Sequence, residues 1–315
     1  MSTSVSSRQP WETWHKDMWE QTFGLEQAVD VASRWPDGIR VAVMLTYDTQ
    51  GDVDAAVPGY QNGTCYWDED NINYNDLSQR QYDARRGVER ILRILGKYDI
   101  RATFPTTGVT AEWYPDVIGS IAEAGHEVAV HGYRHVPLYK LSDAGERNEI
   151  AQGKEAVEAV TGRPARGWRS PMYSSTKRTI RLLTELGFTY DSSFHNDDWP
   201  YALENDGSTL IEIPAGLDDW ELNLMKVPGG ISMGGQSYAA PSAVTDTLVS
   251  HFDMLYEESA EGPRMMQYCM HPKITGRPHR AYGLQRFIEY VGGQDGVWFC
   301  AMEDLAELCL VPAQA

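Results

Sequence analysis

The chain has 315 residues, 42% of them hydrophobic, which is enough for one large domain or two small ones with a sizeable core. Its net charge of −18 argues against nucleic acid and anionic membranes as partners, because both need basic patches. The four cysteines show no paired spacing, and residues 1–11 are polar rather than signal-like. No run of residues approaches the length of a membrane span, so we expect a cytoplasmic protein.

Residues 1–35 are predicted to form an N-terminal arm, and residues 36–315 a single catalytic domain. The arm is Ser-rich at first and aromatic from Trp11 to Trp35, which favours packing on the domain or on a second subunit. The first strong strand is Arg40–Tyr47, nearly continuous in apolar residues, and an acidic segment from Asp48 to Asp54 follows it. Carboxylates after a buried strand are costly unless they are used or solvated, so a solvated acidic turn is the alternative to a functional one.

Residues 58–83 are polar and aromatic without a clear period, which is typical of a lid, a specificity loop or an oligomer contact. Beyond them, helices and strands alternate. Helices are expected at Ala84–Lys97, Pro115–Ala124, Ala144–Thr161 with Asp143 as its cap, Thr176–Leu186, Val244–Ser259 and Arg280–Val291. Strands are expected at Arg101–Phe104, Glu127–Val130, Gly167–Pro171, Phe188–Asp191, Leu210–Pro214, Arg264–Met270 and Val297–Ala301. This alternation predicts parallel strands with crossover helices in one barrel-like α/β domain.

Two histidines follow the strand Glu127–Val130. His131 lies where the strand ends, Gly132 lets the chain turn, and His135 comes four residues after His131. If the chain coils there, both imidazoles face the same way and suit zinc, iron, nickel or cobalt. The alternative is two unrelated histidines.

Other strand ends also carry polar side chains. Arg169 follows the segment at 167–168, and His271 follows the strand Arg264–Met270. Strand ends that are distant in sequence meet at one face of a barrel. A carboxylate, two imidazoles, an arginine and a further histidine would suit metal-assisted hydrolysis. Taken singly, Arg169 could instead form a structural ion pair, and His271 could simply bond a loop.

Five motifs occur in a family's order: TYDTQGD, HGYRH, RSP, DSSFHNDDW and MHP. Over about Arg34 to Leu310 the chain resembles the polysaccharide deacetylase (NodB-homology) family. It is most similar to the branch with allantoinases, cyclic imide hydrolases and peptidoglycan-deacetylase-like proteins. The resemblance implies a distorted (β/α) barrel with fewer than eight complete units. It also implies hydrolysis of a non-peptide carbon–nitrogen bond in a small amide, a cyclic imide or ureide, or an N-acetylated sugar.

The resemblance also implies roles for single residues. They are Asp48 as base, His271 as acid, Arg169 as the group that orients the base, His131 and His135 as metal ligands, Tyr173 as a backbone N–H donor to the oxyanion, and Asp198 and Trp199 as substrate contacts. The metal is expected to be zinc, with nickel, cobalt and iron as alternatives.

The chain departs from the family at the metal-binding aspartate, whose positions are Thr49 and Gln50 here. Asp52 is predicted to take its place, and Asp54 or Asp48 itself are the alternatives. The allantoinases of the branch work without a metal, but both histidines of the metal motif are present here. A catalytically idle barrel that binds a ligand or partner is the competing function. The aromatic arm and the loop at 58–83 favour a homo-oligomer.

Overall fold

The computed structural model describes residues 35–53, 74–205, 207–219 and 241–310. The predictions for the N-terminal arm before Trp35, for residues 58–73 of the expected loop and for Asp54 lie outside the described residues. The rest of that loop differs from the expectation, because residues Tyr74–Arg80 form helix α3 and Asp83–Gly87 a single π-helical turn.

The described strands form two four-stranded sheets, ordered β6-β7-β1-β8 and β2-β3-β5-β4. Their bounds are β1 Val41–Tyr47, β2 Gly167–Trp168, β3 Tyr190–Asp191, β4 Tyr201–Asn205, β5 Ser208–Glu212, β6 Leu217–Asp218, β7 Arg264–Met270 and β8 Val297–Phe299. All neighbours pair in parallel except β4 and β5. β4 and β6 are short elements that the sequence pattern did not predict.

Two extended segments join the sheets. Thr46 bridges to Thr103, Thr103 to Glu127, and Val130 to Trp168, each in parallel. The strands expected at 101–104 and 127–130 are therefore present only as single bridges, within one parallel array from β6 through β1 to β5. In the described residues no ladder joins β4 or β5 to β6, so the array stays open there. This is the distorted, incomplete (β/α) barrel that the sequence predicted.

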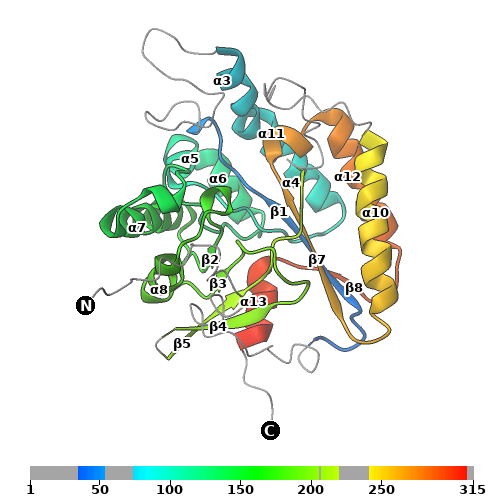
Figure 1. Cartoon of the computed structure of the whole chain (residues 1–315). Coiled ribbons are helices and arrows are strands. Elements are labelled where there is room, and N and C mark those ends of the chain that lie inside the picture. The colour runs from blue at the N-terminus through cyan, green and yellow to red at the C-terminus, as the bar shows by residue number, and fades with distance from the viewer. Residues whose placement is uncertain (1–34, 54–73, 206, 220–240, 311–315) are drawn as a thin grey trace, which may run out of the picture.

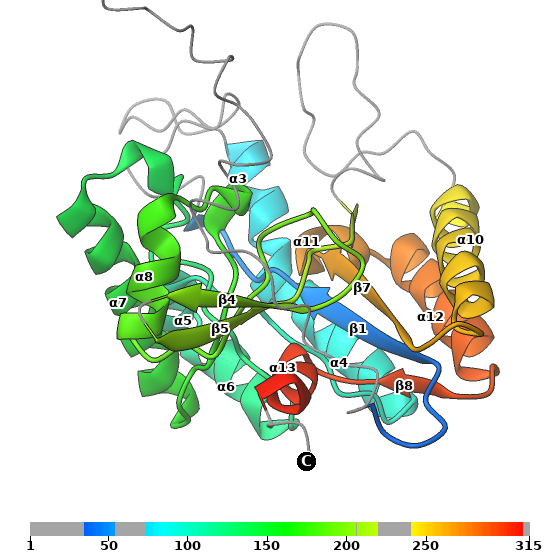
Figure 2. The same ribbon diagram turned by 60° about the horizontal axis from the view of Figure 1, so that its bottom comes forward.

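Helices surround this array, with α5 to α8 on one side of β1 and α10 and α12 on the other (Figures 1 and 2). Their bounds are α4 Val88–Lys97, α5 Gly108–Trp113, α6 Pro115–Glu123, α7 Asp143–Thr161, α8 Lys177–Glu185, α10 Pro241–Glu258, α11 Pro272–Thr275, α12 Pro278–Gly292 and α13 Met302–Leu310. Six of the expected helices are confirmed, while the short α5 and α11 and the C-terminal α13 were not predicted. The part of the chain that the structure describes contains no helix long and apolar enough to span a membrane.

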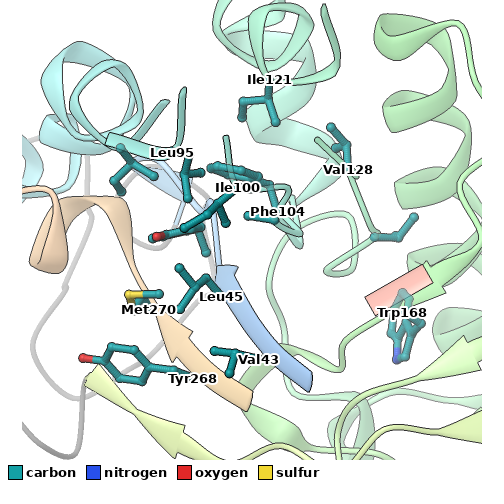
Figure 3. Close-up of a cluster of buried hydrophobic side chains, with 14 of the residues drawn as sticks. Val43, Leu45, Leu95, Ile100, Phe104, Ile121, Val128, Trp168, Tyr268 and Met270 are labelled. Carbon is teal, nitrogen blue, oxygen red and sulfur yellow. The ribbon is translucent and has the colours of Figure 1, made fainter. Parts of the chain in front are cut away.

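The core lies on both faces of β1, whose seven residues are all buried. Figure 3 shows Val43 and Leu45 of β1 among side chains from β7, including Tyr268 and Met270, and from the two bridging segments. A side chain of this size contributes about 1.5–3 kcal/mol when it is fully buried. The continuous apolar run of β1 is explained by this burial on two sides, which fixes where Asp48 leaves the strand.

The cap of α7 differs from the prediction. Ser142, not Asp143, accepts the N–H of Gly145. Glu146, in the first turn of α7, is buried and accepts hydrogen bonds from Thr176 and Thr179 at the start of α8. The Glu146 carboxylate therefore links α7 to α8 instead of capping α7.

Candidate active site

The two histidines of the HGYRH segment face each other, with ring centroids 4.8 Å apart. No helix brings them together. Gly132 has φ +73° and His135 has φ +59°, so the chain turns through left-handed conformations. A Cβ on Gly132 would lie 2.7 Å from Pro171 Cγ, which explains the glycine. The predicted pairing of the imidazoles is thus confirmed, with a different backbone from the one expected.

The tautomer of His131 is set by a neighbouring segment of the same backbone. Its Nδ1 lies 2.9 Å from the carbonyl oxygen of Arg169, an acceptor only, so Nδ1 carries the proton. Burial, opposed by Asp48 and assisted by His135, lowers the pKa of His131 to about 3. His131 is therefore neutral, and its Nε2 presents a lone pair to the site.

Asp48 is buried and held by Arg169, whose Nη1 donates to Asp48 Oδ1 at 2.8 Å. Its other oxygen lies 3.7 Å from His131 Nε2. Burial alone would raise the pKa of Asp48, but Arg169, His131 and His271 lower it to about 2. Arg169 also donates to Thr46 Oγ1 and to the backbone oxygen of Ser192. The ion pair that we considered for Arg169 is thus real, and it keeps Asp48 an oriented carboxylate.

His271 follows β7, as predicted, and Asp219 holds it twice. The Asp219 carboxylate lies 2.8 Å from His271 Nδ1 and accepts the backbone N–H of His271 at 2.9 Å. Burial opposes protonation of His271, but Asp219, helped by Asp218, raises its pKa to about 9. The partner Asp219 was not predicted, although it directly follows β6 as the second acid of an Asp-Asp pair. At neutral pH, His271 is therefore an imidazolium that can give up a proton.

A second unpredicted group adjoins the histidine pair. The amide nitrogen of Gln50 lies 3.1 Å from His135 Nε2 and 3.4 Å from His131 Nε2. The amide oxygen accepts from Lys273 Nζ at 2.5 Å. Sequence reasoning noted Gln50 only as a missing aspartate, and it did not consider Lys273, two residues after His271.

Two predicted residues have other positions than expected. The Asp52 carboxylate accepts from Tyr114 at 2.9 Å and from Gln81 at 3.1 Å, so Gln50 rather than Asp52 reaches the histidines. The Tyr173 N–H donates to Ser170 within a 3₁₀ turn, so this donor is already used. The Trp199 ring packs on the guanidinium of Arg264 at the start of β7, 4.9 Å from its Cζ. The first two positions argue against a metal-ligand role for Asp52 and an oxyanion role for the Tyr173 N–H, whereas a substrate contact for Trp199 stays a prediction.

A cavity of about 400 Å³ adjoins the site, between the end of β5 and β7. His195, Asp198 and Gln267 are among its lining residues. The Tyr173 ring packs edge-on against His195, and Gln267 donates to Thr46, which Arg169 also contacts. The predicted substrate contact Asp198 therefore lines a cavity that is linked to the site through Tyr173 and Gln267, while Asp48 and His271 are not among its lining residues.

The histidine pair does not fit the three-ligand metal site that the family pattern implies. A metal at His131 and His135 needs the two Nε2 lone pairs that the Gln50 amide occupies, and a third, anionic ligand. Asp52 does not supply it, Asp54 lies outside the described residues, and Asp48, 3.7 Å from His131 Nε2, is already paired with Arg169. The described residues contain one group of three possible ligands within 4.8 Å of each other: Asp218, Asp219 and His271. A cation there would compete with the proton on His271 Nδ1. We therefore interpret these three residues as the arrangement that keeps His271 protonated, and not as a metal site.

Comparisons with known proteins agree with this geometry. Residues 72–190 match the family model for polysaccharide deacetylase. A Schizosaccharomyces pombe protein assigned as a polysaccharide deacetylase is 31% identical over 240 residues, 72% of this chain and 73% of that protein. A crystal structure of a Mycobacterium smegmatis protein with the same assignment is 32% identical, with a TM-score of 0.76 over 89% of this chain and 95% of its own. An allantoinase structure is 27% identical, with a TM-score of 0.75 over 90% and 97%. The chain therefore belongs to the polysaccharide deacetylase family.

Proposed function

We propose that this chain hydrolyses a non-peptide carbon–nitrogen bond, with Asp48 as the base and His271 as the acid. The observation that carries the proposal is the opposed pairing of the two groups: Arg169 donates to Asp48 at 2.8 Å, and the Asp219 carboxylate lies 2.8 Å from His271 Nδ1. The site lowers the pKa of Asp48 to about 2 and raises that of His271 to about 9. Between these values one group can accept a proton while the other can give one, as amide hydrolysis requires.

The proposed steps balance without a further reactant. The oxygen of a water attacks the carbonyl carbon while Asp48 takes a proton from that water. The carbonyl oxygen becomes an oxyanion. When the C=O bond forms again, the carbon–nitrogen bond breaks, and the nitrogen takes the proton of His271. Asp48 then loses its proton to solvent and His271 regains one, so the sum is amide plus water to acid plus amine.

A small amide, a cyclic imide or ureide, or an N-acetylated sugar remains the proposed substrate. The cavity beside His195 and Asp198 has the volume usual for small-molecule sites, which supports a compact substrate. The allantoinase neighbour supports a cyclic ureide, and the deacetylase relatives support an N-acetylated sugar. A cytoplasmic location and a homo-oligomeric state belong to the same proposal and rest on the sequence alone.

The zinc expected at His131 and His135, with nickel, cobalt or iron as alternatives, would act there as a Lewis acid. No step of the proposed reaction uses this metal, because the Gln50 amide contacts both ligand atoms, His131 Nε2 and His135 Nε2. The same replacement of an acid by Gln50 favours the competing function, a barrel that binds a ligand without turning it over.

The test is a panel of cyclic imides, ureides and N-acetylglucosamine oligomers, assayed with and without a chelator. We expect turnover of at least one class, reduced about 10²-fold or more by Asp48→Asn and by His271→Ala. Binding of a panel compound without turnover would support the idle barrel. Turnover that both variants retain would refute the assignment of the acid and the base.

A further inference from the structure

The Gln50 side chain is clamped from both ends inside the protein. Lys273 can only donate, so the Gln50 oxygen must face Lys273 and the NH₂ group must face the histidines. That NH₂ has two hydrogens, one for each Nε2 lone pair of His131 and His135. All four side chains are at most 7% exposed, so water does not compete for these bonds.

The buried Asp83 fixes the backbone on both sides of the contact between Gln50 and Lys273, which we call the clamp. The Asp83 carboxylate accepts the N–H groups of Gln50 and Gly51 on one oxygen, at 3.1 and 2.8 Å. Its other oxygen accepts the N–H of Lys273 at 2.6 Å. A single carboxylate therefore sets the relative position of two segments 223 residues apart, which marks a built arrangement rather than a chance contact.

Lys273 is also connected to the acid and the base. Gln50 accepts from Lys273 Nζ at 2.5 Å, the Gln50 amide nitrogen lies 3.4 Å from His131 Nε2, and the same Nε2 lies 3.7 Å from the Asp48 carboxylate. Lys273 is also two residues from His271, so the acid, the base and the ammonium are joined by one set of contacts. An ammonium carries three donors, and within the described residues Gln50 accepts one of them. The other two can serve a substrate oxygen beside Asp48.

We propose that Lys273 and Gln50 replace the metal ion of this site. The Lys273 ammonium donates to the carbonyl oxygen of the substrate and stabilises the oxyanion as water attacks. Gln50 is a positioning residue that holds Lys273 and occupies the two imidazole lone pairs. This inference rests on the proposed amide hydrolysis for its catalytic part, whereas its metal-binding part stands by itself.

The first experiment measures metal binding, with zinc alone as the probe. Four proteins are compared: wild type, Gln50→Asp, Lys273→Met and the double variant. Each is dialysed against zinc and then against buffer before its zinc content is measured, and calorimetry gives its affinity for zinc. We expect well under one zinc per wild-type chain and about one per chain of the double variant, bound at least 100-fold more tightly. The exposed Lys97→Met is the matched control and should behave as wild type. About one zinc per wild-type chain that His131→Ala removes would overturn the proposal.

The second experiment measures turnover of the substrate that the panel identifies. Lys273→Met should lower kcat by about 10²-fold or more, as the loss of an oxyanion donor does, while a chelator leaves the wild type unaffected. A thermal unfolding scan shows whether the variant is folded. A folded Lys273→Met with wild-type kcat, or a wild type that a chelator inactivates and zinc restores, would refute the role of Lys273. If no compound is turned over, the proposed function fails, but the zinc measurements still decide whether the clamp replaces a metal.

Discussion

Replacement of Asp219 by asparagine should move the alkaline limb of the pH profile. The Asp219 carboxylate, against the effect of burial, raises the pKa of His271 from 6.5 to about 9. Asparagine keeps the size and a hydrogen-bond acceptor but removes the charge. Burial then dominates, so the pKa of His271 should fall to 6.5 or below. The difference between about 9 and 6.5 corresponds to roughly 3 kcal/mol, at about 1.36 kcal/mol per pH unit.

The sign of the effect follows from the role of His271 as an acid. The wild-type enzyme should keep its kcat/KM up to pH 8 and lose it as the pH rises through about 9, since the active form is the imidazolium. The same raised pKa stabilises the fold fully below pH 6.5, and this stabilisation is lost as the pH rises through about 9. In Asp219→Asn both losses should begin more than two pH units lower.

The assay is kcat/KM against pH for wild type, Asp219→Asn and Asp218→Asn, with thermal unfolding scans over the same range. Asp218 is the matched control, because it also favours the imidazolium, and its carboxylate accepts a hydrogen bond from Tyr173. Its variant should move the limb by a smaller amount. An alkaline limb that stays in place in Asp219→Asn would show that His271 is not the acid, and His195 would be the next candidate.

Three further predictions concern other parts of the chain. Asp48→Asn should lower kcat about 10²-fold or more and lower the Tm, since Arg169 then stays buried beside a neutral amide; wild-type kcat in the variant would refute Asp48 as the base. Gly132→Ala should lose about 1–3 kcal/mol of unfolding free energy in denaturant titrations, because its φ of +73° and the contact with Pro171 both oppose a Cβ, and an unchanged midpoint would contradict this reasoning. Light scattering at micromolar concentration should give a mass above the 35.4 kDa of one chain, and a monomer mass would end the oligomer prediction.

The sequence predicted those parts of the fold that depend on local pattern. The run of apolar residues in β1 and the same feature in β7 identified both central strands, and their ends located Asp48 and His271. Short elements such as β6 carry too few residues for a period, so the pattern did not indicate them. Because β6 was missed, Asp219 was missed with it, although it determines the protonation of His271.

The site partners that were missed act across long distances in the chain. Lys273 follows His271 by two residues, but only its contact with Gln50 gives it a role, and that contact spans 223 residues. Asp52 was predicted as a ligand because it is the nearest carboxylate after Asp48. The turn that follows Asp48 instead directs Asp52 toward Tyr114 and Gln81. Spacing along the chain could not reveal these directions, since they depend on the backbone conformation of a loop.

The charges around the histidine pair argue further against a tightly bound metal. A divalent ion in place of the Gln50 NH₂ group would lie no more than roughly 5 Å from the Lys273 nitrogen, given the 2.5 Å hydrogen bond and the width of an amide. At an effective dielectric constant of about 20, two charges of +2 and +1 at about 5 Å repel by roughly 7 kcal/mol. Asp48 cannot offset this fully, because Arg169 already pairs with it at 2.8 Å. Lys273→Met should therefore raise the zinc affinity of the site, whereas the exposed Lys97→Met should leave it unchanged. A Lys273→Met variant with the zinc affinity of the wild type would refute this electrostatic argument.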